Sequence, residues 1–183
     1  MRRSSDETKA VILAAARERF GAVGFQGATI RAIAADAGID PAMVMRYYGS
    51  KDKLFAAAAE FDLRFPDLAA ADPTQVGRSL VRHFLERWEG DEALVILLRS
   101  SATNGEAAQR MQEIFGKQIR PLVSSFAPPE QVGARAGLIA TQILGMALCR
   151  FVLRLPPVVE MTRDEIVEWL GPTIQRYLGL PEG

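Results

Sequence analysis

The chain has 183 residues, of which 49% are apolar and 24% are charged. This balance is ordinary for a folded globular protein and excludes a disordered chain, because enough apolar surface is available to form a core. The formal net charge is zero, which argues against a protein that binds nucleic acid with its whole surface. Residues 1–65 hold 10 Lys and Arg against 8 Asp and Glu, so any contact with phosphate is expected from a local patch there.

A single cysteine, Cys149, excludes an intrachain disulfide and is typical of a reducing compartment, so a cytoplasmic protein is expected. Residues 1–30 contain no apolar run of the kind found in secretory signals. The longest uncharged stretch, Ala136–Cys149, has 14 residues and includes Thr141 and Gln142. This stretch is predicted to be too short and too polar to span a membrane.

Helical periodicity dominates the sequence, and no segment shows a sustained alternation of apolar and polar residues, so an all-α fold is predicted. A short basic arm, Arg2–Arg3, precedes the first expected helix, which runs from Asp6 to Val23. Gly24 stands where a glycine commonly ends a helix, because glycine adopts a positive φ without steric cost.

Two short helices are expected next. Thr29 is a good N-cap for a helix over Ile30–Ala37, and Gly38 ends that helix. Asp40 caps the following helix, Pro41–Tyr48, whose first residue is a proline that needs no backbone hydrogen bond there.

A fourth helix is expected from Lys51 to about Arg64, where Phe65-Pro66 ends it. The Pro- and Asp-rich residues 66–74 mark the predicted boundary between a domain of residues 1–65 and a domain of residues 66–183. Pro121 is expected to kink or shorten the helix that contains it. About nine helices are predicted in all, and the five beyond the boundary lie near 74–88, 92–103, 106–126, 131–155 and 162–179.

The two short helices and the turn Gly38–Asp40 form a helix-turn-helix pattern at about residues 29–48. In this motif the second helix enters the major groove of DNA. The small side chains of Ala34, Ala35 and Ala37 allow the two helices to approach closely. Any short helical hairpin gives a similar pattern, so the residues around the motif decide its interpretation.

Candidate phosphate contacts lie on both sides of the second helix. Lys51 stands at the start of the fourth helix, and Thr29 and Arg31 open the helix before the turn. Helix N-termini favour anions because their first backbone N–H groups are free. Tyr47 is a further candidate contact, with packing in the core as the alternative.

The stretch Ile12–Phe55, with the core TIRAIAADAGIDPAMVMRYYGSKDKLF, resembles the TetR family of bacterial repressors. The shared pattern is a Thr-capped helix, an "IA…AGV" turn, a short recognition helix, and an aromatic pair followed by Ser-Lys-acidic-x-Leu. The resemblance implies an N-terminal three-helix DNA-binding domain and a C-terminal helical domain for effector binding and dimerisation. It also implies that Tyr48, where the family has Phe, is buried.

The recognition helix departs from the family at Met45, where the family usually has a Tyr that commonly contacts a DNA phosphate. Few side chains of this helix are polar, so Arg46 is the one polar candidate for reading bases. Apolar contact with thymine methyl groups and the shape of the DNA are expected to supply the rest. The DNA-binding residues predicted in all are Thr29, Arg31, Met43, Arg46, Tyr47 and Lys51.

The expected helix 131–155 carries a small residue at every fourth position from Gly133 to Cys149. A ridge of small residues allows another helix to come close. Packing within one subunit is one interpretation, and a homodimer interface is the other; the TetR resemblance favours the dimer because that family usually dimerises through its last two helices. The residues assigned to the interface are Gly137, Thr141, Gly145, Cys149, Trp169, Thr173 and Tyr177.

Seven apolar residues are candidates for a pocket that binds a small apolar or amphipathic effector, with plain core as the alternative: Phe84, Trp88, Leu98, Met111, Phe115, Ile143 and Met146. Arg99 and Arg150 either meet an anionic ligand or are surface or paired charges. His83 is the only histidine and has no metal-ligand spacing to Cys149, so no metal or cofactor is expected.

The leading hypothesis is a homodimeric repressor of a palindromic DNA operator, released by an effector through a change that passes along residues 64–74. The alternative is a ligand-binding or scaffold protein that has lost specific operator binding, which the apolar recognition helix keeps open. An enzyme is disfavoured because no catalytic constellation stands out.

Overall fold

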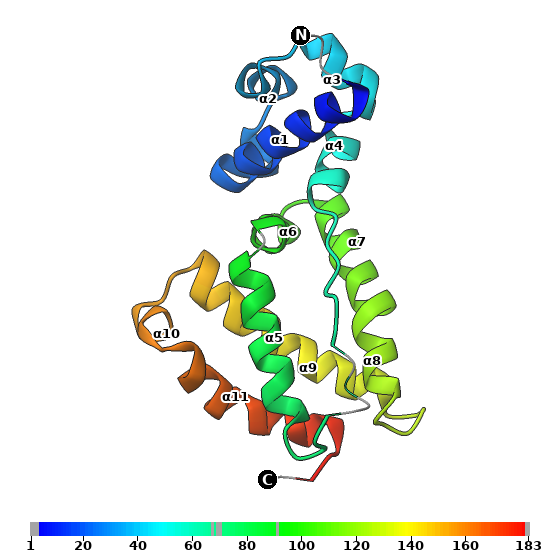
Figure 1. The fold of residues 1–183 in the computed structure, drawn as a ribbon, viewed down its shortest axis with the longest axis vertical. Coiled ribbons are helices and arrows are strands. Elements are labelled where there is room, and N and C mark those ends of the chain that lie inside the picture. Colours follow the sequence, from blue (N-terminus) through cyan, green and yellow to red (C-terminus); the bar gives the residue numbers. More distant parts are fainter. Residues whose placement is uncertain (1–3, 67, 69–70, 91, 182–183) are drawn as a thin grey trace. The chain divides into compact units, whose positions relative to one another are not determined.

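The structure is a computed structural model that describes residues 4–66, 68, 71–90 and 92–181 (Figure 1). All regular secondary structure in this part of the chain is helical, as predicted. The chain forms two compact units, a first unit of Met1–Phe61 with Glu92–Met111 and a second unit of Asp62–Asp91 with Gln112–Gly183. The predicted basic arm Arg2–Arg3 and part of the predicted boundary 66–74 lie outside the described residues.

Ten continuous helical stretches occur in the described residues, against about nine predicted. The first unit holds α1 (Ser5–Gly27), α2 (Ile30–Ala37), α3 (Pro41–Tyr48), α4 (Lys51–Ala58), α6 (Glu92–Ser101) and most of α7 (Gly105–Ile114). The second unit holds α5 (Val76–Gly90), η1 (Phe115–Ile119), α8 (Arg120–Ser124), α9 (Val132–Ala147), η2 (Leu148–Val152), α10 (Pro156–Glu160) and α11 (Arg163–Leu178).

Helix α1 begins with a capping box, in which the Ser4 hydroxyl accepts from the Glu7 amide and the Glu7 carboxylate accepts from the Ser4 amide. The regular helix is interrupted at Gly24, which has φ 69° and ψ 177°. The expected stop at this glycine is therefore confirmed, and a last helical turn follows it as far as Gly27.

Helix α4 ends at Ala58, so the prediction that it continues to Arg64 is wrong. Beyond it the chain is extended, and Phe61 and Leu63 are buried while Asp62 and Arg64 are exposed. Tertiary contacts hold this segment: the Leu63 amide donates to Gln118 Oε1 at 2.7 Å, and its carbonyl lies 2.6 Å from His83 Nε2. These bonds replace the ones that a longer helix would form.

Two π-helical segments occur in the described residues: η1 lies between α7 and α8, and η2 ends the helix that α9 begins. Segment η1 ends just before Pro121, which lacks a backbone N–H, so the predicted disturbance at this proline takes the form of a wider helical turn. The expected separator Pro156-Pro157 instead opens the five-residue helix α10. This helix is the one that the sequence did not predict.

In the second unit α5 packs along α11, and α9 packs against α11 and α8 (Figure 1). Gln175 is 3% exposed and its side-chain amide is fully used. Its Oε1 accepts from the Gly77 amide at 2.6 Å, and its Nε2 donates to the carbonyls of Pro73 and Pro181 at 2.6 and 2.7 Å. Gln175 thereby satisfies one of the free N–H groups at the start of α5.

Helix α9 and segment η2 form one continuous helix of 21 residues, Val132–Val152, in which an 18-residue window has a mean hydropathy of 1.5 and 33% of its residues buried. By length and composition this helix is long and apolar enough to cross a membrane. The expectation that Ala136–Cys149 is too short and too polar to span a membrane is therefore corrected. The helix continues beyond this uncharged stretch on both sides, and its two arginines, Arg135 and Arg150, lie near its ends.

Candidate nucleic-acid interface and partner surfaces

The turn between α2 and α3 has a well-formed helix-stop geometry. Gly38 is in the left-handed region with φ 61° and ψ 40°. The Gly38 amide donates to Ala35 O at 3.1 Å and the Ile39 amide to Ala34 O at 2.9 Å, the bond pattern of a Schellman motif. Asp40 then caps α3 by accepting from the Ala42 amide at 2.7 Å. Local sequence signals therefore fix the angle at which α3 leaves α2.

Thr29 caps α2, as its position predicted, and Ser50 caps α4. The Thr29 hydroxyl accepts from the Ala32 amide at 3.1 Å, and the Ser50 hydroxyl accepts from the Lys53 amide at 3.1 Å. Both caps leave the amides of the first helical residues directed outward at the two helix starts. These starts are the places where the sequence predicted phosphate contacts.

Helix α1 holds the motif in place through an ion pair and an aromatic cluster. Arg19 donates to both oxygens of Asp36 on α2, at 2.8 and 2.6 Å. The hydrogen bond from Arg19 holds the pKa of the Asp36 carboxyl below its ordinary value, and the same bond raises the pKa of Arg19. Below this pair, Phe20 and Phe55 meet edge to face with ring centroids 5.0 Å apart.

The outer face of α3 is short of hydrogen-bonding groups. Met45 is 43% exposed and Arg46 is exposed, whereas Val44 is fully buried and Met43 is half-buried. The predicted base-reading surface is therefore available on the helix, and Arg46 is its charged member. Thr29 and Arg31 are exposed as well, at the start of α2.

The C-terminal end of α3 rests on the N-terminal half of α1. The Tyr48 hydroxyl donates to the Lys9 carbonyl at 3.0 Å, and partial burial raises the pKa of this phenol. Tyr48 is half-buried rather than fully buried, because its hydroxyl must reach that carbonyl. Tyr47 is also half-buried, and Lys9 Nζ lies 5.9 Å from its ring centroid. Lys9 was not predicted as part of this surface, and only the tertiary fold brings it there.

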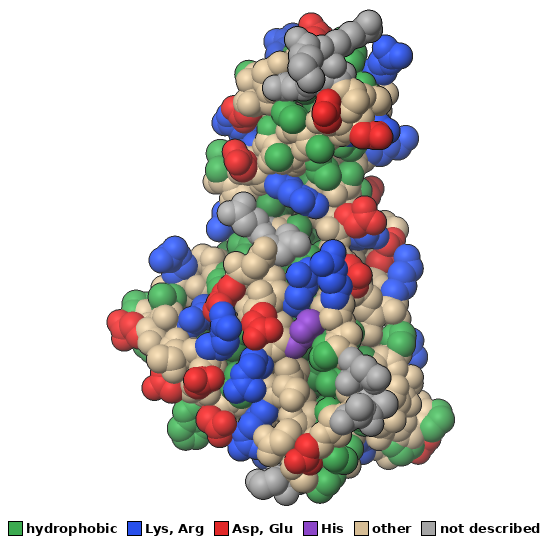
Figure 2. Space-filling view, in the orientation of Figure 1, with side chains coloured by type: hydrophobic (Ala, Val, Ile, Leu, Met, Phe, Trp, Pro, Cys, Tyr) green, Lys and Arg blue, Asp and Glu red, His purple; other side chains and the backbone are tan. Residues whose placement is uncertain are grey.

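Lys51, predicted as a phosphate contact, is half-buried and lies on an aromatic ring. Its Nζ is 4.3 Å from the ring centroid of Phe25. Lys53, on the same helix, is exposed. The face drawn in Figure 2 shows basic and acidic side chains interspersed, as the net charge of zero predicts. Contacts with phosphate would thus depend on a few placed cations rather than on a broad positive field.

The seven predicted pocket residues divide between the two units. Leu98 and Met111 belong to the first unit, and the other five belong to the second. Within the second unit Phe84, Trp88 and Ile143 are buried, while Phe115 and Met146 are half-buried. The Trp88 ring stacks on Phe151 with centroids 6.1 Å apart.

The residues predicted for a dimer interface lie on α9, η2 and α11 and are accessible. Gly137, Cys149, Thr173 and Tyr177 are half-buried, Thr141 and Gly145 are exposed, and Trp169 is 77% exposed. Apart from the backbone of its own helix, a Cβ atom built on Gly133, Gly137 or Gly145 would meet no atom of the described residues within 4 Å. An open groove of about 340 Å³ runs beside this ridge, and its lining includes Thr141, Gly145, Met146, Cys149, Met161 and Trp169.

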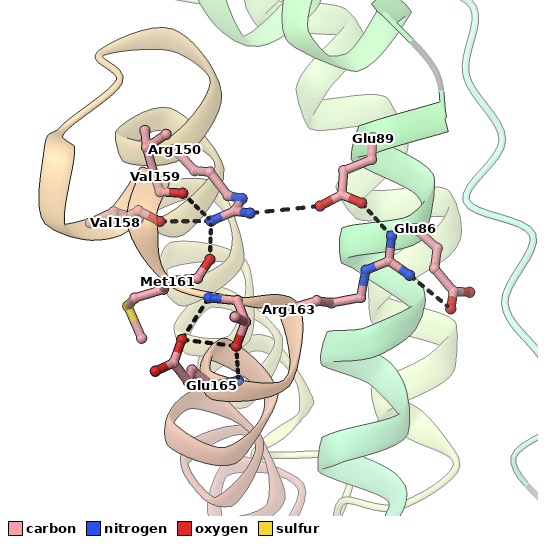
Figure 3. Close-up of polar contacts among 9 residues, drawn as sticks. Glu86, Glu89, Arg150, Val158, Val159, Met161, Arg163 and Glu165 are labelled. Carbon is pink, nitrogen blue, oxygen red and sulfur yellow. Dashed lines mark hydrogen bonds and ion pairs between the residues drawn. The ribbon is translucent and has the colours of Figure 1, made fainter.

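Arg99 and Arg150 are paired rather than directed at an open pocket. Arg99 is exposed and donates to the Gly21 carbonyl. Figure 3 shows Arg150 donating to the carbonyls of Val158 and Met161 at 2.7 and 2.9 Å, while its other terminal nitrogen lies 3.9 Å from Glu89 Oε1. Arg150 therefore ties the α10 segment to α5.

Arg163 completes this network from the start of α11. It donates to Glu89 and lies 3.7 Å from Glu86 Oε1, so the two glutamates of α5 face two arginines (Figure 3). No group of three or more His, Cys, Asp and Glu side chains that could hold a metal ion occurs in the described part of the chain. Arg150 and Arg163 thus form a network of hydrogen bonds and ion pairs with Glu86, Glu89 and the carbonyls of the α10 segment.

A capped helix-turn-helix with exposed basic side chains defines the chain as a helix-turn-helix DNA-binding protein. Residues 12–58 match the family described as "Bacterial regulatory proteins, tetR family", and residues 74–178 match "Tetracyclin repressor-like, C-terminal domain". The chain belongs to the TetR family of bacterial transcriptional regulators, so it is a regulator and not an enzyme.

Individual relatives agree with this assignment. The chain is 36% identical over 87 residues to the HTH-type transcriptional repressor AcnR of Corynebacterium jeikeium, and the match spans 46% of each protein, so about half of this curated relative is covered. A TetR-family regulator from Streptomyces coelicolor A3 has a similar structure, with a TM-score of 0.69, 28% identity and coverage of 97% and 98% of the two chains. A TetR-like transcriptional regulator from Rhodococcus sp. RHA1 is also similar in structure, with a TM-score of 0.66 and 25% sequence identity. The match covers 97% of this chain and 99% of the Rhodococcus chain.

Proposed function

We propose that the chain is a cytoplasmic repressor that binds a palindromic operator as a homodimer and releases it when a small apolar or amphipathic effector binds. The observation that carries the proposal is the Schellman turn at Gly38, which presents α3 with Arg46 exposed. The Corynebacterium relative is named a transcriptional repressor, which supports repression rather than activation of transcription.

In the proposed complex α3 lies in the major groove and the helix starts on either side hold the backbone. Thr29 and Arg31 contact phosphate at the start of α2, and Tyr47 and Lys51 contact it beyond α3. Arg46 reads base edges, while Met43 and the exposed Met45 offer methyl and thioether surface to thymine methyl groups. With so few polar readers, much of the sequence preference comes from the deformability of the DNA.

The proposed dimer forms through α9 with η2 and α11. The continuous helix Val132–Val152 is apolar, yet only 33% of the residues in its 18-residue apolar window are buried within the chain, which supports a partner on its accessible face. Among the described residues, no other element comes within 4 Å of a Cβ built on the glycines of this ridge, which supports approach by a helix of a second copy. A two-fold dimer also matches a palindromic operator, because each copy supplies one recognition helix.

The proposed effector site lies in the second unit, among Phe84, Trp88, Phe115, Ile143 and Met146. These side chains are apolar, which favours an apolar or amphipathic ligand. The extended segment after α4 is held to this unit by Gln118 and His83, so a shift of η1 or α5 would pull on the chain that leads to the DNA-binding helices. In this proposal the conformational change caused by the effector passes to the DNA-binding helices along residues 64–74.

A second candidate function is a ligand-binding or scaffold protein that has lost specific operator binding. Met45 favours it, because this exposed side chain cannot donate a hydrogen bond to phosphate. Fluorescence anisotropy separates the two candidates, with labelled duplex from upstream of the chain's own reading frame and a mixed-sequence duplex as the control. A repressor binds the upstream duplex at least about 1,000-fold more tightly at physiological salt, whereas a scaffold shows no preference.

A further inference from the structure

The aromatic ring under Lys51 is held by the core of the DNA-binding helices. Phe25 follows the break at Gly24, where φ of 69° turns the chain and directs the residue back toward α4. The Phe25 ring stacks on Phe20 with centroids 6.0 Å apart and meets the Phe55 ring in a T-shaped arrangement with centroids 5.1 Å apart. Phe20 and Phe55 are at most 1% exposed, so the Phe25 ring packs against two buried side chains.

Lys51 and Phe55 lie on the same face of α4, four residues apart. Both side chains contact the Phe25 ring: Phe55 packs against it in a T-shaped arrangement, and Lys51 Nζ lies 4.3 Å from its centroid. A cation over an aromatic face at this distance is attracted by the ring quadrupole. Phe25 thus restricts a flexible side chain to one region at the start of α4.

We infer that Phe25 is a positioning residue for DNA binding: its ring pre-orders Lys51 so that the ammonium meets a backbone phosphate without losing further side-chain freedom. This inference rests on the proposed function of the chain. Lysine loses much rotamer entropy when it is immobilised, and fixing it beforehand removes that cost from binding. The ring occupies one side of the ammonium, and its remaining N–H donors stay available for phosphate oxygens.

The test measures binding of the full-length protein to a mixed-sequence duplex across a salt series, so no operator need be known. Lys51→Ala removes the phosphate contact itself, so the slope of log K against log salt becomes shallower by about 0.9 per bound chain. Phe25→Leu keeps the lysine, so the slope stays as in the wild type while affinity falls about threefold to tenfold per chain. Phe25→Tyr restores an aromatic face and returns affinity to within about twofold of the wild type.

Three controls keep the outcomes distinct. Lys53→Ala removes an exposed lysine of the same helix, for which the described residues show no contact with an aromatic ring. The effects of Lys53→Ala and Phe25→Leu on affinity should add independently, whereas Phe25→Leu should have no further effect once Lys51 is replaced by Ala. In NMR spectra of the free protein, the Lys51 side-chain protons next to the ammonium are shifted upfield by the Phe25 ring and lose that shift in Phe25→Leu. Thermal unfolding shows that each variant is folded under the binding conditions.

An unshifted Lys51 signal in the wild type, or equal loss of affinity for Phe25→Leu with and without Lys51, overturns the inference. A folded Phe25→Leu protein with wild-type affinity also overturns it. Absence of any salt-dependent DNA binding by the wild type is a different result, because it refutes the proposed function itself.

Discussion

Gly77 on α5 and Gly171 on α11 face each other where the two helices cross, and neither position has room for a side chain. A Cβ on Gly77 would lie 2.7 Å from the Gln175 amide nitrogen and would clash with the Gly171 carbonyl. A Cβ on Gly171 would lie 2.6 Å from Cγ of Arg78. The α5–α11 crossing therefore depends on backbone approaching backbone, with the Gln175 side chain bridging the contact.

Gly77→Ala is expected to lower the free energy of unfolding by about 1–3 kcal/mol, because the added methyl group must displace the backbone of α11. The measurement is urea denaturation followed by circular dichroism. Gly116→Ala is the matched control, since a Cβ there meets nothing within 4 Å, and it should leave stability unchanged or slightly raised. Equal urea midpoints for Gly77→Ala and the wild type would show that α5 and α11 can move apart to accommodate the methyl group at little cost in stability.

Arg46→Ala is expected to reduce sequence discrimination, because Arg46 is the charged side chain on the exposed face of α3. Its loss should cost about 1–3 kcal/mol on the preferred duplex and much less on a mixed-sequence duplex. Competition binding with both duplexes measures the ratio. Equal losses on the two duplexes would assign Arg46 to phosphate rather than to bases.

The helix-turn-helix was predictable because local signals determine it. Thr29, Gly38 and Asp40 act within a few residues of their own positions, and the structure uses each as a cap or a turn. The end of α4 was not predictable by helix signals, since the bonds from Gln118 and His83 that hold the extended chain come from distant sequence. The short alternation Phe61, Leu63, Phe65 was the available sign of an extended segment.

The sequence predicted which residues form the candidate DNA surface, but not which residues pack against them. Lys51 stood out from its place at a helix start, whereas the roles of Phe25 beneath it and of Lys9 beside Tyr47 depend on how α1 folds back on α3 and α4. For the same reason chain order did not reveal that α6 packs against α1, where Ile96 lies at contact distance from the Gly21 position. Tertiary proximity of this kind leaves no periodic trace in one sequence.

The Arg19–Asp36 ion pair should make the stability of the first unit depend on pH. The folded-state pKa of Asp36 is lowered, mainly by the hydrogen bond from Arg19, so the pair contributes fully above the ordinary carboxyl pKa of about 3.9. The contribution is lost as pH falls through the lower folded-state value. Asp36→Asn should therefore unfold at a lower temperature than the wild type at neutral pH, with the difference shrinking below about pH 4.

Differential scanning calorimetry of both proteins from neutral to acidic pH gives that comparison. Asp52→Asn serves as the control, because Asp52 is exposed and belongs to the same unit. A difference between Asp36→Asn and the wild type that stays constant down to the lowest pH would assign the effect to side-chain shape rather than to charge.

Trp169 should be a central contact of the proposed dimer. It is 77% exposed on α11 and borders the groove beside Thr141 and Gly145, so a second copy related by a two-fold axis could cover it. Exposed tryptophans that become buried on association contribute strongly, and loss of about 2 kcal/mol corresponds to an approximately 30-fold weaker dimer. Trp169→Ala should therefore shift sedimentation of the protein toward monomer at micromolar concentration. Val23→Ala, which truncates an exposed apolar side chain of α1, should leave the dimer intact. A wild-type protein that sediments as a monomer would refute the dimer, whereas unchanged dimerisation of Trp169→Ala would place the interface away from this groove.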